Sequence, residues 1–397
     1  MKLTPLIFLQ VHPINERDYS RFGLAYLQQR GFRIRVFQIA ELIGLKVATH
    51  IGLRDQNVDV VHIDTYEQLE AAVDEVDFGS LFLVLAQSDR DMSRVIVTLV
   101  DAGAHYVQLI CGLVPPFVFI GSGWKSRFVK LMSPSFWVRK LSTAKQRLAM
   151  AVRLRRCVPD FVVVTGEKAV NLAEARWDAE TLRERLVYSN SLDFDLYLEQ
   201  QAQTPRACEP YCVFIDDGFL GHAEFDMFDF ETPSWQQYQQ EITNFFEKVE
   251  TQTGLLVKVA LSPRSSIDLE QQPFGDREVV HNRTSDLISQ SRLVLAHCST
   301  AIGFAVLFEK PVMLLETDEL IDTQWGPIQG FSEALGCKVI NISRADEVAR
   351  IDWTACERFS ASHYEAYRRN YLSSPAAPER RFWEIFVDAL AARFTLP

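Results

Sequence analysis

Several features that define other protein classes are missing from these 397 residues. No run of about 18 consecutive apolar residues occurs, so the sequence predicts no membrane-spanning helix. The apolar run that follows Met1 is too short for a secretory signal. The seven cysteines form no CxxC pair and no zinc-ligand spacing, which indicates reduced thiols in a cytoplasmic protein. GxGxxG, P-loop and GxSxG motifs are also absent, which argues against the enzyme classes that depend on them.

Acidic residues are missing from one long stretch of a chain whose net charge is −11. Between Asp101 and Asp160 there is no Asp or Glu, whereas ten Lys and Arg residues alternate with Trp and Phe. Basic and aromatic residues together suit contact with anionic lipid headgroups, so segment 121–156 is a candidate peripheral contact with a membrane surface. A solvated helical face with buried aromatics is an equal alternative. The acidic balance of the chain argues against nucleic acid as a partner.

The length of the chain is sufficient for two domains, and its hydrophobic pattern predicts two α/β units. Short apolar runs alternate with helical periodicity, which indicates parallel sheets covered by helices. We expect an N-terminal domain over 1–200, a C-terminal domain over 207–375 and a last helix within 376–397 that crosses the junction. The expected strands are 6–11, 34–37, 58–63, 81–85, 106–110, 161–165, 211–215, 255–261, 278–280, 293–296, 312–315 and 338–340.

The most informative segment combines a strand, a polar loop and the start of a helix. The apolar run 293–296 is followed by His297, Ser299 and Thr300. Either hydroxyl can cap the helix that follows, and a capped helix start at the end of a parallel strand favours anions. The segment is therefore a candidate site for the phosphate of a nucleotide-activated substrate. The alternative is one of the many strand–helix units that bind nothing.

Asp216, Asp217 and Gly218 directly follow the first expected strand of the second half. Adjacent carboxylates disfavour each other's ionised form, so one of them can acquire the raised pKa of a general base. An ordinary solvated turn is the alternative.

Other strand ends supply further candidates. Strand 255–261 is followed by Ser262, Pro263 and Arg264, and the Arg264 guanidinium can pair with a phosphate. Thr284 precedes a short helix, where simple capping is the alternative. In the first half, the candidate acceptor contacts lie after the first strand and are His12, Glu16 and Asp18.

No cofactor and no metal are expected. Asp193 and Asp195 match the DxD pattern by which some glycosyltransferases hold a divalent metal. The match is only three residues long, and it lies near the expected domain junction rather than after a central strand.

Taken together, these motifs resemble those of GT-B glycosyltransferases, and more narrowly those of bacterial capsule and O-antigen biosynthesis proteins. The resemblance rests on segments 11–23, 211–222, 258–264, 284–291 and 297–301. It implies two Rossmann-like domains that face a cleft and transfer a sugar without a metal. The donor would be nucleotide-activated, and the acceptor a surface polysaccharide or a lipid-linked glycan.

The resemblance also implies roles for the candidate residues. The donor would bind Gly218, Ser262, Pro263, Arg264, Thr284, His297, Ser299 and Thr300. Asp217, or else Asp216, would deprotonate the acceptor hydroxyl. Enzymes that use CMP-linked acidic sugars carry related motifs, but Ser262 stands here where a His is expected. A nucleotide-sugar epimerase is one alternative, and a catalytically inactive binding subunit is another.

Overall fold

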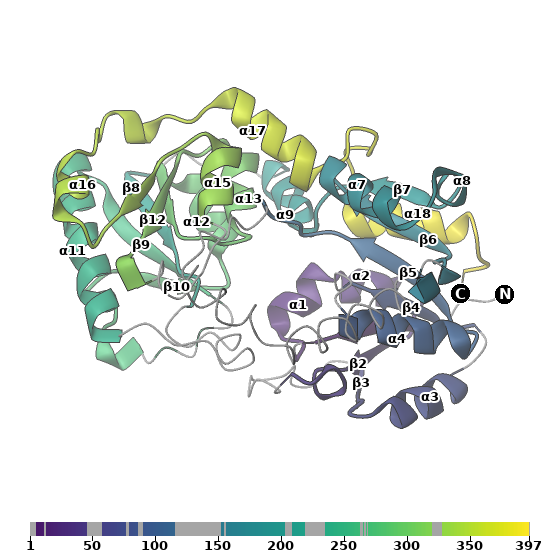
Figure 1. Cartoon of the computed structure of the whole chain (residues 1–397). Helices are drawn as coiled ribbons and strands as arrows, with labels where there is room; N and C mark the ends of the chain where they lie inside the picture. The colour runs from purple at the N-terminus through teal and green to yellow at the C-terminus, as the bar shows by residue number, and fades with distance from the viewer. Residues whose placement is uncertain are drawn as a thin grey trace, which may run out of the picture.

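Two parallel β-sheets, each covered by helices, form the two halves of the molecule (Figure 1). The computed structural model describes residues 5–11, 13–45, 58–76, 79–85, 90–115, 152–154, 156–202, 209–218, 235–262, 265, 267, 269–319 and 328–396. The central strands are buried on both faces. This burial explains why they appear in the sequence as continuous apolar runs.

The first sheet has the strand order β3-β2-β1-β4-β5-β6-β7, and all neighbours are parallel. Its strands are β1 (Leu6–Gln10), β2 (Ile34–Gln38), β3 (Asp59–His62), β4 (Leu81–Val84), β5 (His105–Ile110), β6 (Phe161–Thr165) and β7 (Leu186–Ser189). Its helices are α1 (Glu16–Arg21), α2 (Leu24–Gln29), η1 (Glu41–Ile43), α3 (Tyr66–Asp74), α4 (Arg90–Asp101), α7 (Glu167–Arg176), α8 (Ala179–Leu182) and α9 (Leu192–Gln201). The sequence predicted all of these strands except β7, a short and half-exposed edge strand.

The second sheet has the order β10-β9-β8-β11-β12-β13 and is also parallel. Its strands are β8 (Tyr211–Ile215), β9 (Leu256–Leu261), β10 (Val279–His281), β11 (Leu293–Ala296), β12 (Val312–Glu316) and β13 (Val339–Asn341). The helical elements after β8 are α11 (Trp235–Thr253), η2 (Leu269–Gln271), α12 (Thr284–Gln290), α13 (Ile302–Leu307), α15 (Ile328–Leu335), α16 (Ala345–Ala349), η3 (Ala355–Glu357), α17 (Ala361–Tyr367), η4 (Arg368–Leu372) and α18 (Phe382–Ala391). All six strands match the predicted runs to within a residue at each end.

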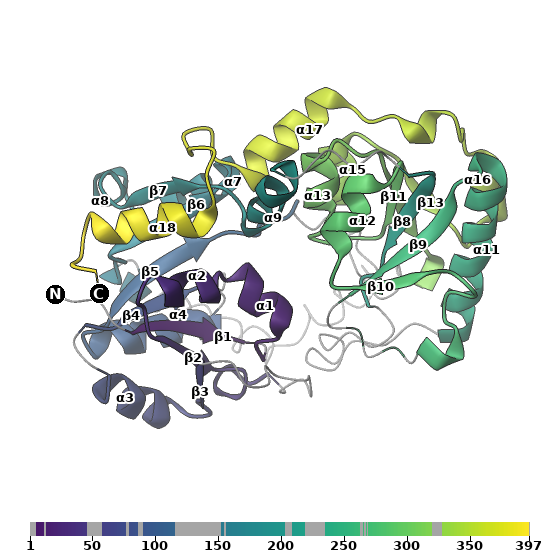
Figure 2. The same cartoon turned by 180° about the vertical axis from the view of Figure 1, so that it is seen from behind.

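In each sheet the strand order changes direction beside the first strand, between β1 and β4 and between β8 and β11. Open α/β sheets bind ligands beyond the carboxyl ends of the strands at such a point. The change in the second sheet brings the loop after β8 next to the loop after β11. In the first sheet it leaves α1 at the edge that faces the second domain (Figure 2).

The C-terminal segment crosses from the second domain back to the first (Figure 1). The crossing is made by α17 and η4, where Tyr367 packs into the core of the second domain. The Ser374 hydroxyl then accepts from the N–H of Gly166 (3.0 Å) and donates to the carbonyl of Val164 (3.1 Å). Helix α18 packs within the first-domain core, where the ring centroids of Trp383 and Phe8 of β1 lie 5.8 Å apart. Helix α18 therefore packs on the first sheet, and the crossing of the junction that was expected of it is made by α17 and η4.

Of the basic, aromatic segment 121–156, residues 121–151 and 155 lie outside the described residues. The described end of the segment is attached to the first domain. Arg153 forms an ion pair with Asp101 (2.5 Å), and Leu154 is buried in the core beside α4. None of the helices in the described ranges has both the length and the apolar character needed to cross a bilayer.

Candidate functional site

A cleft of about 640 Å³ lies between the two domains, where the carboxyl ends of the second-domain strands face α1 and α9. The first domain contributes charged and polar side chains from these two helices. The second domain contributes the residues that follow β8, β9, β10 and β11. The side chains used below are Glu16, Arg17, Ser20, Arg21, Asp193, Gln200, Asp216, Asp217, Ser262, Thr284, Ser299 and Thr300.

Asp216 and Asp217 join the loop after β8 to its two neighbours in the sheet. The backbone N–H of Cys298, after β11, donates to Asp217 Oδ2 at 2.9 Å. The N–H of Ser262, after β9, donates to Asp216 Oδ2 at 3.4 Å. Asp216 is buried, whereas Asp217 is partly exposed in the cleft. The two adjacent carboxylates are therefore held in different environments by fixed backbone donors.

The pKa values of both carboxyl groups are raised, chiefly by burial. Burial raises the pKa of Asp217 to about 7, with a further contribution from the charge of Asp216. The N–H of Cys298 and the hydroxyl of Ser299 oppose this rise because they stabilise the ionised form. Burial raises the pKa of Asp216 to about 6. Asp217 thus has both the access and the proton affinity that a general base needs at neutral pH.

His297 does not line the cleft, which corrects its predicted role as a donor contact. Its ring is fully buried, with Nδ1–H donating to the carbonyl of Leu315 (2.7 Å) and Nε2 accepting from the Tyr238 hydroxyl (2.8 Å). Burial lowers the pKa of His297 to about 4, so the ring is neutral. His297 therefore joins β11 to β12 and α11 from inside the core.

The other second-domain candidates meet in the cleft where the structure describes them. Ser262, Thr284, Ser299 and Thr300 all line it. Ser299 Oγ accepts from the N–H of Ala301 (3.3 Å), one residue before α13 begins, so the expected cap lies in the turn that precedes the helix. Gly218 is buried and has a φ of +72°, a conformation that favours glycine. Pro263 and Arg264 lie outside the described residues.

The predicted acceptor residues separate into three cases. Glu16 is exposed and lines the cleft. Asp18 is only 4% exposed and is absent from the described lining of the cleft. His12 lies outside the described residues.

Sequence reasoning missed the polar side chains that α1 and α9 bring to the cleft. Arg17, Ser20 and Arg21 share one face of α1, and Arg21 Nε pairs with Asp193 Oδ1 at 3.4 Å. The amide of Gln200, at the end of α9, donates to Asp286 Oδ1 at 2.8 Å. The i, i+3, i+4 spacing was visible in the sequence, but the surface that this face meets was not.

Asp193 and Asp195, the two carboxylates of the DxD pattern, have different partners. Asp195 faces α18, where its carboxylate accepts from the N–H of Phe382 at 2.7 Å. Burial raises the pKa of Asp195 to about 7. Within the described ranges, no three His, Cys, Asp or Glu side chains are grouped as they would be to hold a metal ion.

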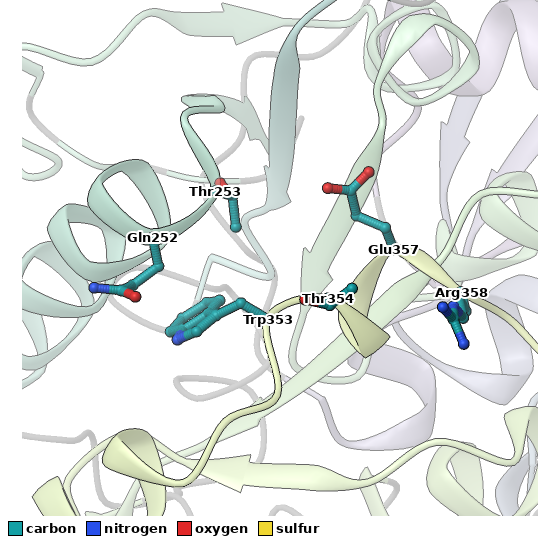
Figure 3. Close-up of a pocket in the computed structure, with 6 residues that line it drawn as sticks. All are labelled: Gln252, Thr253, Trp353, Thr354, Glu357 and Arg358. Carbon is teal, nitrogen blue, oxygen red and sulfur yellow. The ribbon is translucent and has the colours of Figure 1, made fainter.

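A second hollow of about 340 Å³ lies on the surface of the second domain (Figure 3). Its lining includes Thr253, which precedes β9, and Glu357, which forms an ion pair with Arg292 just before β11. It therefore lies at the amino ends of the strands, opposite the edge where open α/β sheets bind ligands. We assign the functional site to the interdomain cleft.

Comparison with known proteins identifies the fold. No protein-family model matches this sequence, and no curated protein matches it. The wall teichoic acid polymerase TagF is similar in structure, with a TM-score of 0.53, 10% identity, and 98% of this chain and 90% of that chain covered. The S. aureus protein MnaA, solved with UDP, has a TM-score of 0.51 and 13% identity over 99% and 97% of the chains.

A Listeria monocytogenes protein, given as a candidate UDP-N-acetylglucosamine 2-epimerase, has a TM-score of 0.50 and 10% identity over 99% and 97% of the chains. At such low identity, these similarities establish the architecture and leave the activity open. The chain has two Rossmann-like domains that face a cleft, the GT-B architecture that the resemblance predicted.

Proposed function

We propose that this protein is a glycosyltransferase that moves a sugar from a nucleotide-activated donor to a surface-polysaccharide or lipid-linked acceptor. The observation that carries the proposal is Asp217. Its carboxyl group lies in the interdomain cleft, is oriented by the Cys298 N–H, and has a pKa raised to about 7. These are the requirements of a general base that deprotonates a hydroxyl.

In the proposed reaction, Asp217 takes the proton of the acceptor hydroxyl as its oxygen attacks the anomeric carbon of the donor. The bond between that carbon and the phosphate oxygen breaks, and the phosphate leaves with the electron pair. The Thr300 hydroxyl is proposed to donate to this phosphate, and Ser299, whose hydroxyl hydrogen-bonds to Asp217, is proposed to lie against it, because both residues line the cleft. Ser262 and Thr284 are proposed to contact the rest of the donor, together with Gly218, Pro263 and Arg264.

The structural neighbours support this proposal at the level of the architecture. MnaA was solved with UDP, and TagF is a wall teichoic acid polymerase, so the architecture is used both with a nucleotide and in surface-polymer synthesis. Peripheral contact with the inner membrane through segment 121–156 remains part of the proposal, since a lipid-linked acceptor would lie at that surface.

A nucleotide-sugar epimerase is the second candidate, because the Listeria monocytogenes neighbour is assigned to that class. An epimerase would interconvert a nucleotide sugar without any acceptor. Incubation of the protein with a nucleotide sugar alone separates the two: epimerisation yields an isomeric nucleotide sugar, whereas a transferase releases free nucleotide only when it hydrolyses the donor or an acceptor is added.

The first experiment is a thermal-shift screen against CMP, CDP, UDP, GDP and dTDP. A bound nucleotide raises the midpoint of thermal unfolding by mass action and identifies the donor class, with CMP indicating an acidic sugar.

The matched test of catalysis compares Asp217→Asn with Asp346→Asn, which changes an exposed carboxylate on α16. We expect Asp217→Asn to lower transfer by about 10²-fold or more and Asp346→Asn to leave it unchanged. Near-normal transfer by Asp217→Asn would remove Asp217 as the base, and failure of every nucleotide to bind would favour the inactive subunit.

A further inference from the structure

Arg21 on α1 belongs to the first-domain wall of the cleft, and its side chain makes only a long ion pair within the described residues. The Arg21 side chain is only 19% exposed, and its Nε is buried without a hydrogen-bond partner in the described part of the chain. This same Nε instead faces Asp193 Oδ1 in a long ion pair of 3.4 Å, and the Asp193 side chain is itself only 11% exposed. A buried guanidinium is costly unless its N–H groups are paired, and one long ion pair at Nε leaves the part of Arg21 that lines the cleft able to bind a further acceptor.

The surroundings of Arg21 are suited to an anion. Arg17 and Ser20 lie four residues and one residue before it on α1, and all three side chains line the cleft. Two guanidinium groups and a hydroxyl on one helix face can bind a carboxylate or phosphate through several charge-assisted hydrogen bonds. The helix itself is held in place because the Arg21 carbonyl accepts from Trp383 Nε1 at 3.0 Å.

We propose that Arg21, with Arg17 and Ser20, forms a binding site for an oxyanion group of a substrate on the first-domain wall of the cleft. This inference rests on the proposed function in that it places the oxyanion on a substrate of transfer. The group is a carboxylate or phosphate, carried either by the acceptor or by the donor as its diphosphate. Asp193 then competes with this group for the Arg21 guanidinium.

The test compares two variants that differ only at Arg21. Asp193→Asn removes the competing carboxylate, and the double variant Arg21→Met with Asp193→Asn removes both members of the ion pair, so no buried charge is left alone. Calorimetric titration with inorganic phosphate is expected to show tighter binding by Asp193→Asn than by the wild type. It is expected to show binding weaker by about tenfold or more in the double variant. Arg30→Met, an exposed arginine stacked on Tyr26, is the control for the lost charge.

Titration with UDP, CDP and uridine identifies the source of the oxyanion. If the double variant loses affinity for phosphate but not for the nucleoside diphosphates, the anion belongs to the acceptor. If it loses affinity for the diphosphates and not for uridine, the anion belongs to the donor. Equal phosphate affinity in the double variant and Arg30→Met, or no phosphate binding by the wild type, would overturn the site. Arg21-dependent phosphate binding without any nucleotide binding would retain the site and reject the proposed function.

Discussion

At the scale of single residues, the buried position that suits Asp217 to act as a base also lowers the free energy of unfolding when its carboxyl group is ionised. Burial raises the pKa of Asp217 to about 7 from an ordinary value of 3.8. A carboxyl group whose pKa is raised on folding contributes stability fully below its unfolded pKa, and that contribution is lost as pH rises through the folded pKa. The free energy of unfolding that Asp217 contributes therefore falls as the pH rises from about 4 to about 7.

Asp217→Asn removes this titration and keeps an oxygen for the Cys298 N–H. We expect the variant and the wild type to have similar free energies of unfolding at about pH 4. At about pH 8 the variant should be more stable by about 1–3 kcal/mol. Urea denaturation across this range measures the difference. A difference that stays constant with pH would show that folding does not raise the pKa of Asp217.

His297 gives the opposite kind of prediction, because its role is structural. His297→Ala removes the hydrogen bonds that its ring makes with Leu315 and Tyr238. We expect a loss of about 2–4 kcal/mol in the free energy of unfolding. Nucleotide affinity, measured well below the unfolding transition, should not change. An intact stability together with lost nucleotide binding would return His297 to the donor site.

At the scale of elements, the contact between α7 and η4 depends on a glycine. Gly166 has a φ of +82°, and a side chain there would collide with the backbone carbonyl of Asn370. Since η4 connects the second domain to Ser374 and α18, this close approach sets the path by which the chain returns to the first domain.

Gly166→Ala should therefore cost more than the backbone penalty alone. Gly103, at the end of α4, has a similar φ of +75° but open space around it, and it provides the matched control. We expect Gly103→Ala to lower the free energy of unfolding by about 1 kcal/mol and Gly166→Ala by about 2–4 kcal/mol. Urea denaturation measures both variants. Equal losses would mean that η4 shifts away from α7 without cost.

At the scale of the whole molecule, the two ends of the chain form one core. Trp383 of α18 is 3% exposed and packs on Phe8 of β1, although the two are separated by almost the entire sequence. The first domain is thus complete only when the C-terminal helix has returned from the second domain (Figures 1 and 2).

Trp383→Ala should destabilise the first domain selectively. We expect a loss of about 3–5 kcal/mol, which is typical for a buried Trp replaced by Ala. Hydrogen exchange should accelerate in peptides that contain β1 and stay unchanged in those that contain β8. Trp353→Ala, which removes a partly buried Trp packed against the second-domain core, is the control and should leave β1 unchanged. Faster exchange in β8 alone would place α18 with the second domain.

The strands could be predicted because a strand buried on both faces must be apolar along its length, as in 161–165, 211–215 and 293–296. Strand β7 was missed, and its half-buried edge position alone does not explain this, because the edge strands β3, β10 and β13 are similarly exposed and were predicted. The loop that carries Asp216 and Asp217 was predicted as a site, since it follows a central strand. The error at His297 arose because adjacency to Ser299 does not show which side of a loop faces the core.

The sequence by itself determined the two parallel α/β domains and the polar loops at the ends of their central strands. These properties depend on local periodicity and on short-range order along the chain. Only the tertiary structure decided that Arg21 meets Asp193, that His297 lies in the core, and that Trp383 completes the first domain. Each of these depends on contacts between segments far apart in sequence, and their partners are set by the packing of whole helices and sheets rather than by any local pattern.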